Sequence, residues 1–248
     1  MNMTLLDIIK GLKGIDATMD VAYPIIDDTS PYVKSAQAYD RLGYGKIVLI
    51  DFRRCTFPYV SPSILSELQQ VENRKARNVE DMLDEKQLCY ISEVLKAYFA
   101  LLKKDYAHVE TSVLHFDLSI NGAICKEMIH TSLTPCLLGA NKDVILGLCM
   151  LTYSTRKQTG NALVKLAEVD YHLELENDEW VQTDNSHLTN MEKVIIGQCA
   201  NGKSIASIAE HLSVSTSTIK THRTNILKKL GVTNITEAIQ YVEDYNLI

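Results

Sequence analysis

The chain has 248 residues, 46% of them hydrophobic and 23% charged, and a formal net charge of −6 at pH 7. This length suits two domains, and this composition is typical of a folded globular protein. The N-terminal residues lack the basic start and continuous apolar run of a signal peptide, and no later stretch approaches the roughly 18 apolar residues that span a bilayer. We therefore expect a cytoplasmic protein without a membrane partner.

The N-terminal part of the chain, residues 1–182, is predicted to form an α+β domain. Apolar runs at 45–52 and 57–60 predict two strands, and the next segment predicts a helix that begins at Ser61. A second helix, which is long and amphipathic, is predicted over 84–104. Strands dominate the rest of this domain.

Three later segments carry the strand pattern. Residues 111–120 and 169–176 alternate strictly between apolar and polar side chains, whereas 143–153 is apolar enough to be a central strand. Alternation with a period of two indicates one buried face, which is typical of antiparallel sheets. The strands at 164–182 are expected to form an added hairpin, followed by a linker at 183–187.

The order of two strands, helices and three strands, with hairpin-like links at 121–122 and 139–143, resembles a PAS-type sensory domain over residues 40–155. The segments "YVSPSI" and "LCMLTYST" also resemble that family. The resemblance implies a pocket or a dimer surface formed by the sheet and the helices. A small-molecule ligand of the N-terminal domain is therefore a candidate partner.

Catalytic and metal-binding patterns are missing from the sequence. It contains no G-x-S-x-G, H-E-x-x-H, P-loop or G-x-G-x-x-G motif. Six cysteines are scattered without a C-x-x-C pair or a neighbouring histidine at metal-ligand spacing, so they are expected to be reduced thiols. We therefore expect neither an enzyme nor a bound metal or cofactor.

Positive charge is concentrated toward the C-terminus. Residues 1–187 contain 19 basic and 26 acidic residues, a net charge of −7, whereas 188–248 contain 6 basic and 5 acidic residues, a net charge of +1. No acidic residue occurs between Glu210 and Glu237. A locally cationic segment in an acidic protein is typical of a DNA-binding domain whose phosphate contacts are few and concentrated.

Four short helices are predicted in residues 188–248, because local start and stop signals are dense there. The expected N-caps of these helices are Thr189, Ser204, Ser215 and Asn234. Glu192 completes a capping-box pattern with Thr189, and Gly231 is expected to end the third helix. Two short helices joined by a tight turn, the second of them cationic, are the pattern of a helix-turn-helix.

The third helix has an apolar face and a polar face. Its apolar stripe consists of Ile219, Ile226, Leu227 and Leu230. The opposite side, which a major groove would receive, carries Ser217, Lys220, Thr221, Thr224 and Lys228. Lysine donates hydrogen bonds to guanine edges or phosphate, and threonine offers a hydroxyl and a methyl group that suits thymine.

The segment "LTNMEKVIIGQCANGKSIASIAEHLSVSTSTIKTHRTNILKKLGVTNITEA" resembles the LuxR-type helix-turn-helix domain. The resemblance covers about a quarter of the chain. It implies that Lys220, Thr221 and Thr224 approach bases. It also implies that Thr218, Arg223 and Asn225 lie near phosphates. The segment departs from the family pattern at Asn190, where proline is usual, at Gly197 inside the first helix, and at Ile205, which replaces a more polar residue.

The expected DNA-binding residues are Lys220, Thr221, Thr224, Ser217, Thr218, Ser215, Arg223, Asn225, Lys228 and Lys203. Structural explanations compete for some of the cationic residues. Lys228 and Lys229 also suit the negative end of a helix dipole. Arg223 lies toward the apolar stripe, where its stem can cover apolar surface. His222 borders the same stripe and is expected to pack there rather than to contact a base.

These patterns predict a transcriptional regulator with a PAS-like sensory domain in 1–182 and a four-helix LuxR-type DNA-binding domain in 188–248. Double-stranded DNA and a second copy of the chain are the expected partners, and RNA polymerase is a further candidate. The apolar flank Ile239, Val242 and Leu247 of the fourth helix is expected to form the dimer contact.

Two alternatives remain open at this point. The first is a response regulator with an atypical receiver domain that is phosphorylated at Asp117, and the second is an interaction adaptor that does not bind DNA. The alternating strand around Asp117 argues against the receiver, because receiver strands are buried on both faces of a parallel sheet. Substitution of Asp117 by asparagine is therefore expected to leave DNA binding nearly unchanged.

Overall fold

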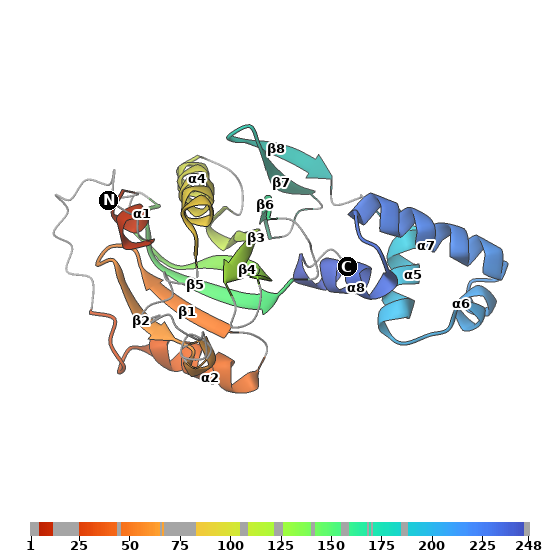
Figure 1. The fold of residues 1–248 in the computed structure, drawn as a ribbon, viewed down its shortest axis with the longest axis horizontal. Helices are drawn as coiled ribbons and strands as arrows, with labels where there is room; N and C mark the ends of the chain where they lie inside the picture. Colours follow the sequence, from red (N-terminus) through yellow and green to blue (C-terminus); the bar gives the residue numbers. More distant parts are fainter. Residues whose placement is uncertain are drawn as a thin grey trace.

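The computed structural model describes residues 5–11, 25–43, 46–64, 66, 83–104, 109–121, 126–139, 142–154, 159–167, 169, 171–184 and 188–245. The N-terminal part is a sheet with helices packed on it, and the C-terminal part is a group of helices (Figure 1). This arrangement confirms the predicted α+β fold class and the predicted order of the two parts. No helix of the described residues is long and apolar enough to cross a membrane.

The sheet has eight strands in the order β2-β1-β5-β4-β3-β6-β7-β8, and neighbouring strands are antiparallel. The strands are β1 (Lys46–Asp51), β2 (Thr56–Val60), β3 (Val113–Asn121), β4 (Lys126–Leu138), β5 (Val144–Tyr153), β6 (Gly160–Lys165), β7 (Tyr171–Glu176) and β8 (Glu179–Asp184). In this order β1 lies next to β5, so β1 and β2 extend the sheet that β3, β4 and β5 form. The strands predicted at 164–182 are present as β6, β7 and β8. β7 and β8 form a hairpin, and β6 joins this hairpin to the sheet by pairing with β3.

The receiver alternative is wrong. In a receiver domain, the acceptor aspartate would lie at the end of a parallel strand, and its side chain would be accessible to solvent. Asp117 instead lies within β3, which runs antiparallel to both of its neighbours, and its side chain is fully buried. The strand continues beyond Asp117 to Asn121, as the alternating pattern predicts.

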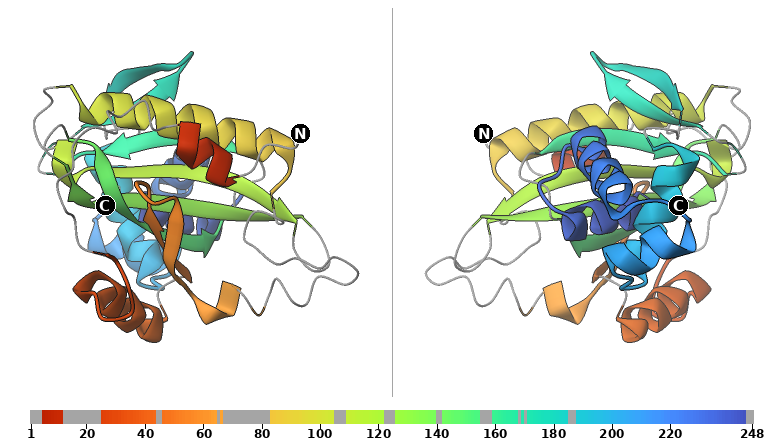
Figure 2. Two further views of the ribbon diagram at one scale, coloured as in Figure 1. Left: turned by 90° about the vertical axis from the view of Figure 1, so that its left-hand side faces the viewer. Right: turned by 90° about the vertical axis from the view of Figure 1, so that its right-hand side faces the viewer.

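One face of the sheet packs against α4 (Glu85–Leu102), and α1 (Leu5–Gly11) packs against α4 (Figure 2). The N-cap residue Asp84 accepts a hydrogen bond from the backbone N–H of Gln87, which fixes the predicted start of α4. The strands that follow β5 also contact α4. The indole N–H of Trp180 in β8 donates a hydrogen bond to the carbonyl oxygen of Ala97 in α4 at 2.9 Å. The main hydrophobic core lies between this face and α4.

The opposite face of the sheet is covered near β1 and β2 by α2 (Pro31–Leu42). Val33 and Ala36 of this helix pack in one buried cluster with Ile47, Leu49 and Leu146. Residues 62–64 are helical, as the pattern after Ser61 predicts, but most of that predicted helix lies outside the described residues.

The C-terminal helices are α5 (Asn190–Ala200), α6 (Ile205–His211), α7 (Thr216–Leu230) and α8 (Ile235–Asp244). The four predicted N-caps are confirmed, since each side chain accepts a hydrogen bond from a backbone N–H of its own first turn. Gly231 ends α7 with a φ of 65°, a left-handed conformation that suits glycine. The helices surround a shared apolar core that includes Ile195, Ile208, Ile219, Ile226 and Val242.

Candidate functional site

A cavity of about 110 Å³ lies in the apolar core between the sheet and α4. Its walls are nearly all apolar, and they include Val48, Phe52, Phe116, Leu118, Leu133 and Leu151. The exceptions are Lys46 and Thr131. The Lys46 ammonium group donates a hydrogen bond to the Tyr153 hydroxyl at 3.1 Å, so it already has a partner in the structure.

Thr131 is the polar feature of this cavity that has no partner of its own. Its hydroxyl oxygen is buried and makes no hydrogen bond within the described part of the chain. A buried hydroxyl without a hydrogen-bond partner destabilises the fold, because it has lost its hydrogen bonds to water. A ligand that forms one hydrogen bond with this hydroxyl would offset that loss. Thr131 is not among the residues predicted from the sequence. Its only signal was a hydroxyl on the apolar face of β4, between Ile129 and Leu133.

The second candidate surface is formed by α6, α7 and the turn that joins them. The turn passes through Ser213, whose φ of 54° is unusual for a residue other than glycine. Ile208 and Ala209 of α6 and Ile219 of α7 are buried in one cluster, which fixes the two helices against each other. This packing fixes which side of α7 faces solvent.

The predicted polar side of α7 is exposed. Among the ten predicted DNA-binding residues, the exposed ones are Lys203, Ser215, Ser217, Lys220, Thr221, Thr224, Asn225 and Lys228. The other two, Thr218 and Arg223, are half-buried. Nine of the ten lie on α7 or at its N-cap, and Lys203 directly precedes the N-cap of α6.

Several of these hydroxyl groups already make hydrogen bonds. Thr221 donates to the carbonyl oxygen of Ser217 and Thr224 to that of Lys220, both at 3.1 Å. With its proton used in this way, each threonine presents an acceptor oxygen and a methyl group to the outside. Ser215 caps α7 by accepting the N–H of Thr218, so its side chain has a structural role in addition to the predicted phosphate contact.

Arg223 and His222 lie where the alternative explanations placed them. Both are half-buried, and the Nδ1 atom of His222 is buried without a hydrogen-bond partner among the described residues. Burial raises the pKa of the Cys199 thiol in α5, and the nearby Arg223 guanidinium lowers it. The Arg223 guanidinium therefore lies near Cys199 of α5, and the half-burial of Arg223 agrees with the packing role expected for its stem.

Residues 186–242 match the sequence model of the family described as "Bacterial regulatory proteins, luxR family". This segment is a LuxR-type helix-turn-helix domain. The match confirms the resemblance predicted from the cap, core and turn residues.

Curated proteins are similar to part of this chain. Transcriptional regulatory protein MctR of Rhizobium johnstonii is 37% identical over 70 residues, which cover 28% of this chain and 33% of MctR. The uncharacterized transcriptional regulatory protein YhcZ of Bacillus subtilis is 45% identical over 60 residues, which cover 24% of this chain and 28% of YhcZ. The matched region thus spans about a third of the length of these curated relatives.

Among solved structures, the phage VqmA–DPO complex covers 87% of this chain and 91% of its own, with 15% sequence identity and a TM-score of 0.28.

Within the LuxR-type domain, Glu192 joins the start of α5 to the end of α7. Its carboxylate accepts hydrogen bonds from the Thr189 backbone N–H and from the Lys229 ammonium group, both at 2.7 Å, and its side chain is only 3% exposed. Burial raises the pKa of Glu192, whereas the hydrogen bonds from Lys229 and Thr189 lower it. The lowering effects together are the larger, so the pKa lies below its ordinary value. Lys229 therefore has a structural role.

Glu192→Gln is expected to destabilise the LuxR-type domain by about 1–2 kcal/mol, because it weakens both the capping box and the bond to Lys229. Urea denaturation followed by far-ultraviolet circular dichroism measures this loss. Because the folded pKa of Glu192 is lowered, its contribution is complete above the unfolded pKa near 4.5 and disappears as the pH falls below it. The exposed Glu210→Gln is the control, with an expected change within about 0.5 kcal/mol. Equal effects of the two substitutions would contradict this role.

Proposed function

We propose that the chain is a sequence-specific DNA-binding transcriptional regulator that acts in the cytoplasm, with a sensory domain in 1–182 and a DNA-binding domain in 188–248. The exposed polar side of α7 carries this proposal. Lys220, Thr221 and Thr224 share that side, in a segment without acidic residues that lies within the match to the luxR family. The relatives MctR and YhcZ, which are similar over 70 and 60 residues, are both named as transcriptional regulatory proteins.

In this proposal, α7 enters the major groove and its residues divide into two groups. Lys220, Thr221 and Thr224 contact base edges, because they lie at the centre of the exposed side. The cationic and hydroxyl groups around them, from Lys203 to Lys228, contact phosphates and fix the orientation of the helix. The acceptor oxygens of the two threonines suit amino groups of adenine or cytosine, and their methyl groups suit thymine.

The DNA-binding form is proposed to be a homodimer on two half-sites. One domain with six cations makes few phosphate contacts, so a second copy supplies the remaining affinity. The flank of α8 predicted for the dimer contact needs correction, because Val242 is fully buried within the chain and Leu247 lies outside the described residues. Ile239 is partly exposed and remains a candidate. RNA polymerase is the proposed partner at the promoter.

The sensory domain is proposed to bind a small apolar molecule with one hydrogen-bonding group. The cavity between the sheet and α4 has almost purely apolar walls, so a charged ligand would lose its hydration without compensation. The Thr131 hydroxyl is buried in this cavity without a partner among the described residues, and it is therefore the expected contact for the polar group. Ligand pockets commonly combine apolar walls with a few polar groups that orient the ligand.

Selection of binding sites from random double-stranded DNA, with the purified full chain, tests the proposed function. We expect an enriched inverted repeat, whose affinity falls as the salt concentration rises. Absence of DNA binding would support the adaptor alternative, and binding without any enriched sequence would show that the binding is not sequence-specific. Either outcome would overturn the proposal. If a single half-site is bound as tightly as the repeat, the homodimer is wrong while sequence-specific binding stands.

A further inference from the structure

A buried polar contact connects the LuxR-type domain to the sensory sheet. The hydroxyl of Tyr245, the residue that ends α8, donates a hydrogen bond to the Asp117 carboxylate of β3 at 2.8 Å. The other carboxylate oxygen lies 3.2 Å from Nδ1 of His130 in β4. Asp117 is fully buried, and Tyr245 and His130 are 1% and 2% exposed. The two bonded residues are 128 positions apart in the sequence.

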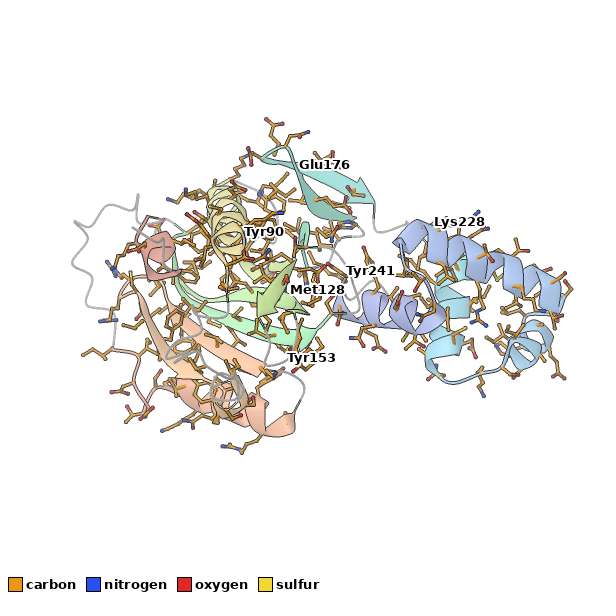
Figure 3. The ribbon with its side chains drawn as sticks, viewed as in Figure 1. Tyr90, Met128, Tyr153, Glu176, Lys228 and Tyr241 are labelled. Carbon is orange, nitrogen blue, oxygen red and sulfur yellow. The ribbon has the colours of Figure 1, made fainter. Side chains whose placement is uncertain are left out.

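Aromatic packing surrounds this hydrogen bond. The Tyr245 ring meets the His130 ring edge to face, with centroids 4.7 Å apart, and His130 stacks on His115 at 5.3 Å. Tyr241 lies one turn earlier on α8, and its ring centroid is 4.7 Å from that of Tyr245. Figure 3 shows Tyr241 at the junction between α8 and the sheet. Leu163 of β6 belongs to the same buried cluster as the helical core, so the junction also contains apolar contacts.

We propose that Tyr245 is a positioning residue that fixes the orientation of the LuxR-type domain on the sensory sheet through its bond to Asp117. A buried carboxylate needs hydrogen-bond donors, and Tyr245 and His130 supply them. Separation of the domains would remove one donor from Asp117 and expose the apolar surface of the junction. Burial and the neighbouring His130 lower the pKa of His115 to about 3, so His115 adds no positive charge near neutral pH.

The oriented arrangement leaves the DNA-binding side open. In Figure 1, α8 lies next to the sheet, α6 lies farthest from it, and α7 extends from the α6 end back toward α8. Lys220, Thr221 and Thr224 are exposed in this arrangement. The contact therefore does not block α7. Instead, the contact limits the orientations of the LuxR-type domain before DNA binds. Less orientational freedom is then lost when the domain binds an operator with two half-sites. This inference rests on the proposed function, because orientation matters only if the domain binds DNA.

Tyr245→Phe tests the inference, because it keeps the ring and removes the hydroxyl. The control is Tyr59→Phe, which also removes a 2.8 Å hydrogen bond from a tyrosine hydroxyl to a carboxylate. That carboxylate belongs to the half-buried Asp40, and the bond lies where β2 meets α2. Small-angle X-ray scattering of the full chain should give a larger radius of gyration for Tyr245→Phe and no change for Tyr59→Phe. Loss of one bond to a charged group should shift the docking equilibrium by about 10-fold or more.

DNA affinity supplies the second measurement. We expect Tyr245→Phe to weaken binding to the selected inverted repeat by about 3- to 10-fold and to leave binding to a single half-site unchanged. The double variant of Tyr245→Phe and Asp117→Asn should lose no more than the stronger single variant, because both remove the same bond. Unchanged scattering and affinity in folded Tyr245→Phe would overturn the inference. If the wild-type chain selects no DNA sequence, the proposed function fails, and scattering alone decides whether the contact orients the domain.

Discussion

Lys220→Ala is expected to weaken binding to the selected operator by about 1–3 kcal/mol, which corresponds to roughly 5- to 150-fold. Lys220 is exposed on α7, and Ser217, Thr221 and Thr224 lie close to it on the same side of the helix. The loss should be concentrated at particular base positions, because a base contact discriminates among sequences. Fluorescence anisotropy with the selected operator and with single-base variants, at one fixed salt concentration, measures both effects.

Lys228→Ala is the matched comparison. Lys228 lies in the last turn of α7, so a phosphate contact is expected there. Its loss should reduce affinity about equally for all sequences and flatten the salt dependence by about one unit of slope. The assigned orientation of α7 is wrong if Lys220→Ala changes neither affinity nor sequence preference, or if the two variants behave alike.

Gly147→Ala is expected to destabilise the sensory domain by about 1–3 kcal/mol, because overpacking forces neighbouring side chains to move. A Cβ atom at Gly147 would lie 2.9 Å from a methyl carbon of Leu133 and 2.9 Å from a ring carbon of Phe52. Leu133 and Phe52 both line the cavity, so the substitution also narrows the proposed ligand site. Urea denaturation followed by the fluorescence of Trp180 measures the stability change.

Gly197→Ala makes the same chemical change in a different environment. Gly197 lies inside α5, and a Cβ atom there would have no heavy atom of the described residues within 4 Å, apart from its chain neighbours and the backbone of its own helix. Alanine is a better helix former than glycine, so this variant should stabilise the LuxR-type domain by up to about 1 kcal/mol. If Gly147→Ala and Gly197→Ala changed the free energy of unfolding by similar amounts and in the same direction, close packing at Gly147 would not control the stability of the sheet.

The helical domain could be predicted almost completely from its sequence, because its signals are local. Thr189 and Glu192 mark the start of α5 through contacts within one turn of the chain. Ser215 marks the start of α7 in the same way, and Gly231 marks its end. The alternation that predicted β3 is equally local. Strand order is not, and no pattern near β6 indicated that it pairs with β3.

The contact between Tyr245 and Asp117 could not be predicted either. Neither residue carries a local motif, and the bond exists only because α8 packs on the sheet. From the sequence alone, Asp117→Asn was expected to leave DNA binding nearly unchanged. The buried hydrogen bonds of Asp117 give a physical reason to expect otherwise. The unpaired Thr131 hydroxyl is a similar case, since a sequence does not show which hydroxyl groups lack partners.

The two outer strands of the sheet, β2 and β8, determine how copies of the chain can associate. Pro58 in β2 has no N–H group to offer to an added strand. Glu179 and Asp184 place negative charges at the two ends of β8, where an identical strand would bring like charges together. Edge-to-edge pairing of two sheets is therefore disfavoured. Self-association is directed to side-chain surfaces, and the sheet is protected against growth into fibrils.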